Sequence, residues 1–200
     1  MNYINQLNYP DLIYITRTKL EGADRESGKT TTIKSSGCGL CCAVMVAKNL
    51  IPDCNFEIED AIKLSYESEA NAYIGTNYKF FAPAFSQKFN LEYESTCDIE
   101  RLKDWLGSGG IAVANVGGDR EGYTGVFSKK GHYITVINLE NDNRVALLDP
   151  SYCEGKYESE GRKGKVKMKD GFIAVCDISV LKKDAENRNP SFHLFRLNNK

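Results

Sequence analysis

The segment around Cys38 carries the strongest chemical signal in this chain of 200 residues. Cys38 stands between Gly37 and Gly39, and the apolar run of residues 40–47 follows at once. The pattern predicts a tight turn that opens into a helix over Cys38–Leu50. A thiol at a helix N-terminus lies beside unpaired N–H groups and the positive end of the helix dipole, and both stabilise a thiolate. Cys38 is therefore a candidate nucleophile with a lowered pKa.

The chain has only two histidines, and His132 is placed to serve as the base. Residues 132–139 are rich in β-branched side chains, and a second apolar run follows at 144–148. The polar turn between the two runs predicts an antiparallel hairpin that begins at His132. Asp149 ends the second strand, so strand pairing brings its carboxylate back towards His132. We expect Asp149 to orient the imidazole, which takes the proton from Cys38 and later protonates a leaving amine.

Each of these residues also has an ordinary structural interpretation. Cys38 could be a small buried apolar residue, and His132 could be a packed strand residue. Asp149 precedes a proline and could be a turn former. Three features in one consistent geometry favour catalysis over three unrelated structural roles.

The same segments resemble those of a known family. Residues 31–39 and the small-residue helix after them resemble the nucleophile segment of papain-like cysteine peptidases, in the branch that processes bacteriocin leaders. Stand-alone bacterial relatives of that branch are more similar still. Residues 131–136 resemble the family's Gly-His strand, and Asp149-Pro150 resembles its Asp-Pro pair. The similarity covers about residues 3–152, although Leu40 replaces the family's usual proline.

The resemblance implies a single papain-like α+β domain. A helical lobe over about residues 1–107 carries the nucleophile helix and packs on an antiparallel β-sheet over about residues 108–200. The implied activity is that of a cysteine peptidase, which hydrolyses peptide or protein substrates through a thioester acyl-enzyme. Cys38, His132 and Asp149 would be its catalytic residues, and the reaction needs no cofactor and no metal.

The resemblance also points to an oxyanion donor. The family commonly uses a glutamine about six residues before the cysteine, and Thr32 occupies that position here. Gln6 is the other candidate, because stand-alone relatives often begin with a similar glutamine. The backbone N–H of Cys38 is a donor that needs no side chain.

Several alternatives stay open. Cys38 and Cys41 form a C-x-x-C pair, which is typical of dithiol redox proteins, but the residues before it are polar where a thioredoxin-like fold needs a strand. A structural zinc site would need a second close pair of ligands, and the other cysteines are scattered. The absence of a glutamine at Thr32 allows a weak or inactive peptide-binding module. An acyltransferase would use the same triad to pass the acyl group to an amine.

Composition excludes two classes of partner. The 26 basic and 27 acidic residues give a net charge of −1, which argues against a nucleic-acid binder. No run approaches the roughly 18 apolar residues of a membrane-spanning helix. The N-terminus has neither the basic region nor the apolar run of a signal peptide. The seven cysteines are an odd number and do not suggest a disulfide framework. We therefore expect a cytoplasmic protein with free thiols.

Other segments must position these residues. Periodicity predicts further helices at 53–69, at 78–89 with Phe81, Phe85 and Phe89 on one face, and at 98–107 between a cap at Asp98 and a stop at Gly107. Strand-type runs occupy 111–116, 132–139, 144–148, 171–181 and 191–197. Polar segments predict loops at 18–32, at 117–125 as a lip over the cleft, and at 162–167 as a solvated basic cluster.

Overall fold

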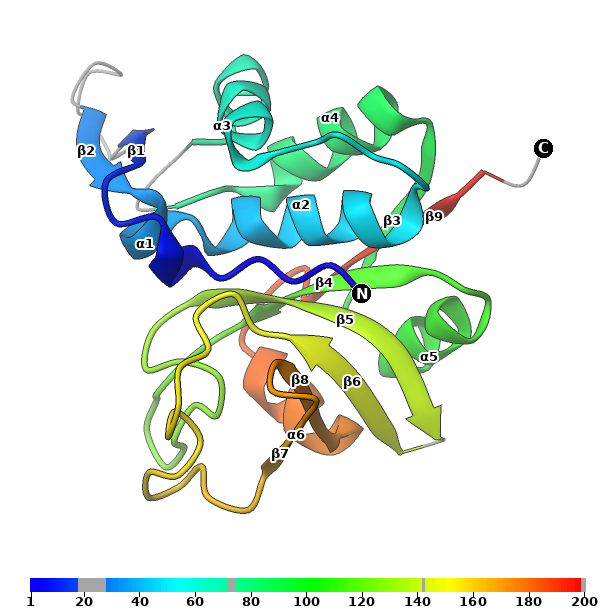
Figure 1. The fold of residues 1–200 in the computed structure, drawn as a ribbon. Helices are drawn as coiled ribbons and strands as arrows, with labels where there is room; N and C mark the ends of the chain where they lie inside the picture. The colour runs from blue at the N-terminus through cyan, green and yellow to red at the C-terminus, as the bar shows by residue number, and fades with distance from the viewer. Residues whose placement is uncertain (18–27, 72–74, 142, 199–200) are drawn as a thin grey trace.

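The computed structural model describes residues 1–17, 28–71, 75–141 and 143–198, which form a mixed α+β fold (Figure 1). Its main sheet is antiparallel, in the order β3-β9-β4-β5-β6-β8-β7. The strands are β3 (Leu91–Thr96), β4 (Ile111–Val116), β5 (His132–Asn141), β6 (Arg144–Leu148), β7 (Val166–Lys169), β8 (Ile173–Asp177) and β9 (Phe192–Leu197). The predicted class, α+β with an antiparallel sheet, is confirmed at this level.

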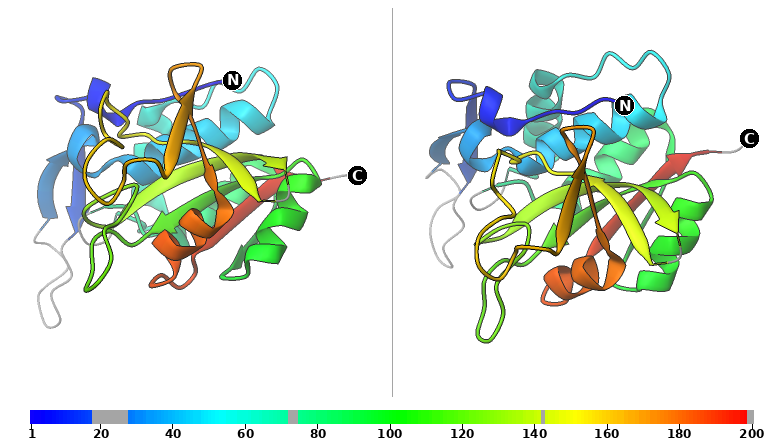
Figure 2. Two further views of the ribbon diagram at one scale, coloured as in Figure 1. Left: turned by 90° about the horizontal axis from the view of Figure 1, so that it is seen from below. Right: turned by 60° about the horizontal axis from the view of Figure 1, so that its bottom comes forward.

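Helices cover both faces of this sheet. The helices are α1 (Ile33–Ser36), α2 (Cys38–Leu50), α3 (Ile58–Glu67), α4 (Tyr78–Phe89), α5 (Ile99–Gly107) and α6 (Ile178–Ala185). Figure 1 shows α2, α3 and α4 above the sheet, and the view from below in Figure 2 shows α5 and α6 against the opposite face. A short 3-10 turn, η1 (Gln6–Asn8), and a separate hairpin of β1 (Ile13–Arg17) and β2 (Gly28–Thr32) complete the fold.

The sequence of β4 is apolar at nearly every position because both faces of this strand are covered. Ile111 and Val113 pack into the core beneath α2 and α4. Ala112, Ala114 and Val116 point the other way, into the core with α5 and α6. Side chains alternate between the two faces of a strand, so a strand covered on both sides must be apolar throughout. This central strand thereby joins the two cores.

The predicted helices over Cys38–Leu50 and 78–89 match α2 and α4 in both bounds. Burial of Phe81 and Phe85 confirms the aromatic face of α4, and Phe89 packs against the same core. The predicted strands at 111–116 and 144–148 match β4 and β6. Regular hydrophobic periodicity therefore located the elements that face the core.

Four predicted elements are wrong in part because local caps or partners decide their bounds. Gly28–Thr32 forms β2 rather than a loop, since it pairs with β1; residues 18–27 lie outside the described part of the chain. Helix α3 starts only at Ile58, after a capping box in which the Glu57 backbone N–H donates to Asp60. The strand expected to reach 181 ends at Asp177, whose side chain caps α6. Ser108 rather than Gly107 is the C-cap of α5.

The basic cluster at 162–167 is only partly a solvated loop. Arg162 is buried, and its Nε donates to the carbonyl oxygen of Gly125 over 2.9 Å. Val166 and Lys167 belong to β7. No helix among the described residues is long and apolar enough to cross a membrane.

A buried carboxylate anchors the connection that leads into His132. Asp184 of α6 accepts hydrogen bonds from Tyr123 Oη at 2.8 Å and from the backbone N–H of Val126 at 2.9 Å. Its second oxygen accepts the N–H of Phe127 at 3.1 Å. The side chain of Asp184 is fully buried, so water cannot serve as the acceptor for these donors in its place. The connection is thus fixed a few residues before the candidate base.

We predict that Asp184→Ala destabilises the protein. Two buried backbone N–H groups lose their acceptor, and each unsatisfied group costs up to about 3 kcal/mol, so we expect the free energy of unfolding to fall by about 3 kcal/mol. Urea denaturation would measure the change. Asp104→Ala, which removes an exposed carboxylate from α5, is the control and should change stability by no more than about 0.5 kcal/mol. Equal stability of the two variants would contradict the anchoring role.

Candidate active site

Two glycines place Cys38 at the tip of α2. A Cβ on Gly37 would lie 2.7 Å from the carbonyl oxygen of Ile33, so only glycine fits between α1 and α2. A Cβ on Gly39 would lie 3.0 Å from both Thr76 and Tyr78 side-chain atoms. Cys38 itself is partly exposed, while the α2 residues that follow it are buried as far as Ala47. Cys38 is therefore the only partly exposed residue of α2 before Lys48.

The β5–β6 hairpin brings His132 and Asp149 together. Thr135 pairs with Leu148, so the start of β5 lies beside the residue that follows β6. His132 Nε2 lies 2.8 Å from Asp149 Oδ1, and the two side chains are 6% and 1% exposed. The thiol of Cys38 and the imidazole of His132 line the same cleft, and the imidazole is close enough to lower the pKa of the thiol. Because Nε2 faces the carboxylate, Nδ1 is the ring nitrogen left for the sulfur.

Electrostatics in this group favour a thiolate beside an imidazolium. Burial alone would raise the pKa of Cys38, but hydrogen bonding and charge from His132 outweigh burial and lower it. Burial alone would lower the pKa of His132, but the charge of Asp149, followed by hydrogen bonds to Asp149 and Cys38, raises it to about 9. Between these two pKa values the sulfur is negative and the ring is positive. That is the form in which a cysteine is nucleophilic.

Asp149 is held ionised by a ring of donors. Beyond His132, Oδ1 accepts the backbone N–H of Ser151 at 2.9 Å and its hydroxyl at 3.1 Å. Oδ2 accepts Tyr157 Oη at 2.5 Å and the ammonium of Lys156. Burial would raise the pKa of Asp149, but the charges of Lys156 and His132 and their hydrogen bonds hold it far below its usual range. The carboxylate is thus charged at neutral pH.

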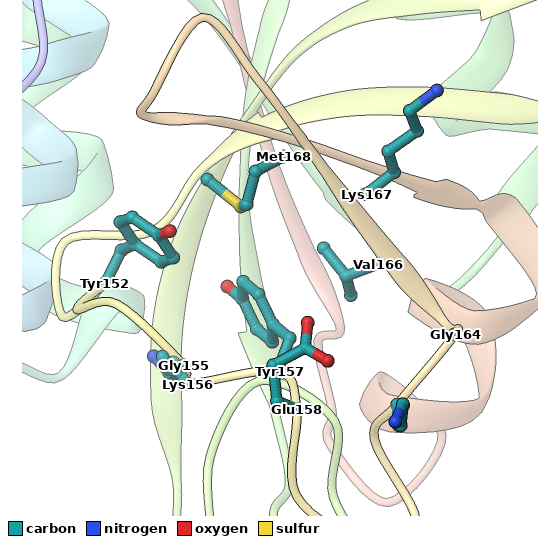
Figure 3. Close-up of a pocket in the computed structure, with 10 residues that line it drawn as sticks. Tyr152, Gly155, Lys156, Tyr157, Glu158, Gly164, Val166, Lys167 and Met168 are labelled. Carbon is teal, nitrogen blue, oxygen red and sulfur yellow. The ribbon is translucent and has the colours of Figure 1, made fainter.

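Ser151, Lys156 and Tyr157 were not identified from the sequence. They lie within eight residues after Asp149, so nearness to the predicted carboxylate was the only available signal. The same segment, with β7, lines a separate pocket of about 490 Å³ (Figure 3). Tyr152, Tyr157, Val166 and Met168 surround this pocket. Tyr157 therefore donates a hydrogen bond from its hydroxyl to Asp149 and also lines this second pocket.

A cleft of about 940 Å³ opens over Cys38 and His132. One wall consists of residues from β2 and α1, and the other consists of residues 128–133. The predicted lip at 117–125 does not line it; the later part of the same connection does. Asp184 holds the earlier part against α6, away from the thiol.

The structure brings Gln6, but not Thr32, to the cleft. Gln6 lines the cleft with Cys38, and its Nε2 donates one hydrogen to the carbonyl oxygen of Lys34 at 2.7 Å. An amide nitrogen carries two hydrogens, so one remains. Thr32 is instead the N-cap of α1. The N–H of Cys38 is the first of α2, a position with no acceptor inside the helix.

The other cysteines and the second histidine have structural surroundings. All seven cysteines are free, and burial raises the pKa of Cys41 above its ordinary value, which makes it a poor partner for dithiol chemistry. His193 is buried, and its Nδ1 forms a hydrogen bond with Tyr93 Oη at 3.0 Å. Burial and the charge of Lys79 lower the pKa of His193 to about 4. Within the described ranges, no group of three His, Cys, Asp or Glu side chains could hold a metal ion.

No protein-family model matches this chain, and no curated protein matches it either. The function must therefore be inferred from the site itself. Its three predicted residues lie together at the junction of α2 with the β5–β6 hairpin.

The first prediction from this site concerns the pH dependence of Cys38 alkylation. Iodoacetamide should modify Cys38 faster than an exposed thiol at pH 6, because the neighbouring imidazole lowers the pKa of its sulfur. Exposed Cys97 and Cys153 are internal controls, and both should be labelled more slowly than Cys38 at this pH. Mass spectrometry of the labelled peptides measures all three. In His132→Ala, Cys38 should lose its reactivity at pH 6; retained reactivity would contradict the ion pair.

A second prediction concerns Lys156 as a positioning residue. Its ammonium offsets the charge of Asp149 and repels the imidazolium, so Lys156→Met should raise the pKa of His132 above about 9, by about one unit. NMR of the imidazole resonances measures this pKa, with His193 as an internal reference. Lys156→Arg keeps the charge and should leave the pKa unchanged, as should Lys163→Met, which removes an exposed lysine nearby. A lower or unchanged pKa in Lys156→Met would contradict the proposed coupling.

Proposed function

We propose that this protein is a papain-like cysteine peptidase that hydrolyses peptide bonds in a peptide or protein substrate. One observation carries the proposal: a thiol at the tip of α2 shares a cleft with an imidazole, and a buried carboxylate holds that imidazole at 2.8 Å. A cleft opens over the thiol and the imidazole, so a substrate has access to both. The placement of the thiol on a helix and of the other two groups on a sheet supports the papain-like assignment.

The geometry supports a two-step reaction. The Cys38 thiolate attacks the carbonyl carbon, and the electron pair of the C=O bond moves to oxygen. When the tetrahedral intermediate collapses, the C–N bond breaks and His132 gives its proton to the leaving amine. A thioester on Cys38 remains. His132 then takes a proton from water as the water oxygen attacks the thioester carbon. The C–S bond breaks, which releases the carboxylic acid and restores the Cys38 thiolate beside the protonated His132.

Two donors from residues that line the same cleft support stabilisation of the oxyanion. The backbone N–H of Cys38 is one, and the free hydrogen on Gln6 Nε2 is the other. Such donors act best when they are already oriented before the charge develops. Gln6 meets this condition because its backbone N–H is fixed to the carbonyl oxygen of Pro150 at 2.7 Å and its side chain to Lys34.

The polarised thiol argues against an inactive binding module. A peptide-binding descendant would have no need for a buried carboxylate with five donors behind a histidine, because buried charges are costly to maintain. Acyl transfer would use the same thioester, and the products distinguish the two reactions. Seven free thiols support a reducing compartment such as the cytoplasm.

We predict that the wild-type protein cleaves members of a peptide library and that Cys38→Ala abolishes cleavage without unfolding the chain. Asp149→Asn should retain more activity, by about one to two orders of magnitude, because it disturbs orientation and not the nucleophile. Mass spectrometry of the products and circular dichroism of the variants provide the two readouts. Cleavage by Cys38→Ala would refute the assignment. Transfer to an added amine, in preference to water, would identify an acyltransferase.

A further inference from the structure

The cleft over Cys38 has an excess of positive charge. Its lining includes four cationic side chains: Lys29, Lys129, Lys130 and Arg188. Among the described residues that line it, none is Asp or Glu. The chain as a whole is close to neutral, with 26 basic and 27 acidic residues, so the cleft concentrates charge that the rest of the surface balances. A cleft lined by one sign of charge attracts ligands of the opposite sign.

Arg188 is built into the wall beside the catalytic histidine. Its Nη2 donates to the carbonyl oxygen of Gly117 at 3.1 Å. A Cβ on Gly131 would lie 2.7 Å from the same nitrogen, so the guanidinium packs directly against the residue before His132. Glycine at position 131 leaves the space that Arg188 occupies. The guanidinium is therefore held in place and does not extend into solvent.

Arg188, like Arg162, has no acidic partner among the described residues, but Arg188 lines the cleft. Arg101, Arg120 and Arg196 each form an ion pair with a glutamate. In the described part of the chain, no carboxylate forms an ion pair with Arg188, and its buried Nε has no hydrogen-bond partner. A buried N–H without an acceptor is costly, and a guanidinium fork suits a carboxylate. Although Nε is closed off from solvent, the side chain is partly exposed at the cleft, and its Nη1 has no hydrogen-bond partner among the described residues. This nitrogen is the group left to bind a substrate carboxylate.

Lys129 and Lys130 extend the charge along the same wall. Both are exposed and lie immediately before Gly131 and His132. Exposed lysines contribute little to bound-state affinity, but they steer an anionic ligand towards the site. Arg188 thus binds the anionic group, while the two lysines increase the rate at which an anionic ligand reaches the cleft.

We infer that the substrate is an acidic peptide segment. An Asp or Glu side chain of this segment, close to the cleaved bond, binds Arg188 through its carboxylate. This inference rests on the proposed function, since it names the substrate class of the same cleft. The lining residues beyond the cations are mostly hydroxyl and amide side chains, which suit a polar segment. Among the described lining residues, none is Val, Leu, Ile, Met, Phe or Trp.

Alkylation of Cys38 by two reagents tests the inference without a substrate. Iodoacetate carries a carboxylate and iodoacetamide does not, while both lose iodide to the same thiolate. We expect Arg188→Gln to reduce the ratio of the iodoacetate rate to the iodoacetamide rate about tenfold, the effect of one charge-assisted hydrogen-bonded pair. Arg188→Lys should give an intermediate ratio, because it keeps the charge and loses the fork. Arg144→Gln, an exposed arginine on β6 outside the cleft lining, is the matched control and should leave the ratio unchanged.

Paired peptides test the same inference in catalysis. Peptides that differ only by Glu or Gln near the cleaved bond should differ at least about tenfold in kcat/KM in favour of Glu. Arg188→Gln should remove this preference, and added salt should reduce it. Equal or faster cleavage of the Gln peptide, together with an unchanged alkylation ratio in Arg188→Gln, would overturn the inference and leave the peptidase proposal intact. Absence of all cleavage, with an alkylation ratio that responds to Arg188, would refute the peptidase proposal and support anion binding.

Discussion

The ionised carboxylate of Asp149 is the group on which the candidate site depends. It receives five hydrogen bonds while almost fully buried, and it holds the imidazole of His132 in one orientation. A buried charge is tolerated only when its partners are complete, so the surrounding loop must adopt one arrangement. That arrangement in turn fixes the pKa of His132 and, through it, the state of the sulfur. The hydrogen bonds of Asp149 therefore determine both the conformation of the surrounding loop and the protonation of His132.

The N-terminal segment is bound to the same place. Tyr3 Oη donates to the carbonyl oxygen of Asp149 at 2.7 Å, and Asn5 Nδ2 donates to that of Tyr152 at 2.8 Å. The backbone N–H of Gln6 donates to Pro150 at 2.7 Å. Residues separated by almost 150 positions thus share one set of backbone contacts, which places the amide of Gln6 in the cleft. The helical part of the chain and the sheet meet along this line.

The sequence allowed prediction of those features that depend on local pattern. Periodicity placed α2 and α4, and the hairpin rule brought Asp149 to His132, because strand pairing follows from the turn between β5 and β6. Features that depend on distant partners were missed. Polar β2 is a strand only because β1 pairs with it, and Arg162 is buried only because Gly125 accepts its hydrogen bond. Lys156 and Tyr157 gave no sign of their role, since their contacts with Asp149 arise from a loop without regular structure.

The order of these elements along the chain has a consequence for biosynthesis. Cys38 precedes His132 by 94 positions, so the ribosome adds α2 well before His132. Nine successive residues of α2 are buried in the folded protein, so the helix lacks a stable burial partner until the sheet strands exist. Strand β9 lies between β3 and β4, so the main sheet is complete only when the residues of β9 have been added. His132 and Asp149 meet only through the pairing of β5 with β6. The three residues of the candidate site therefore come together late in synthesis, when tertiary structure forms.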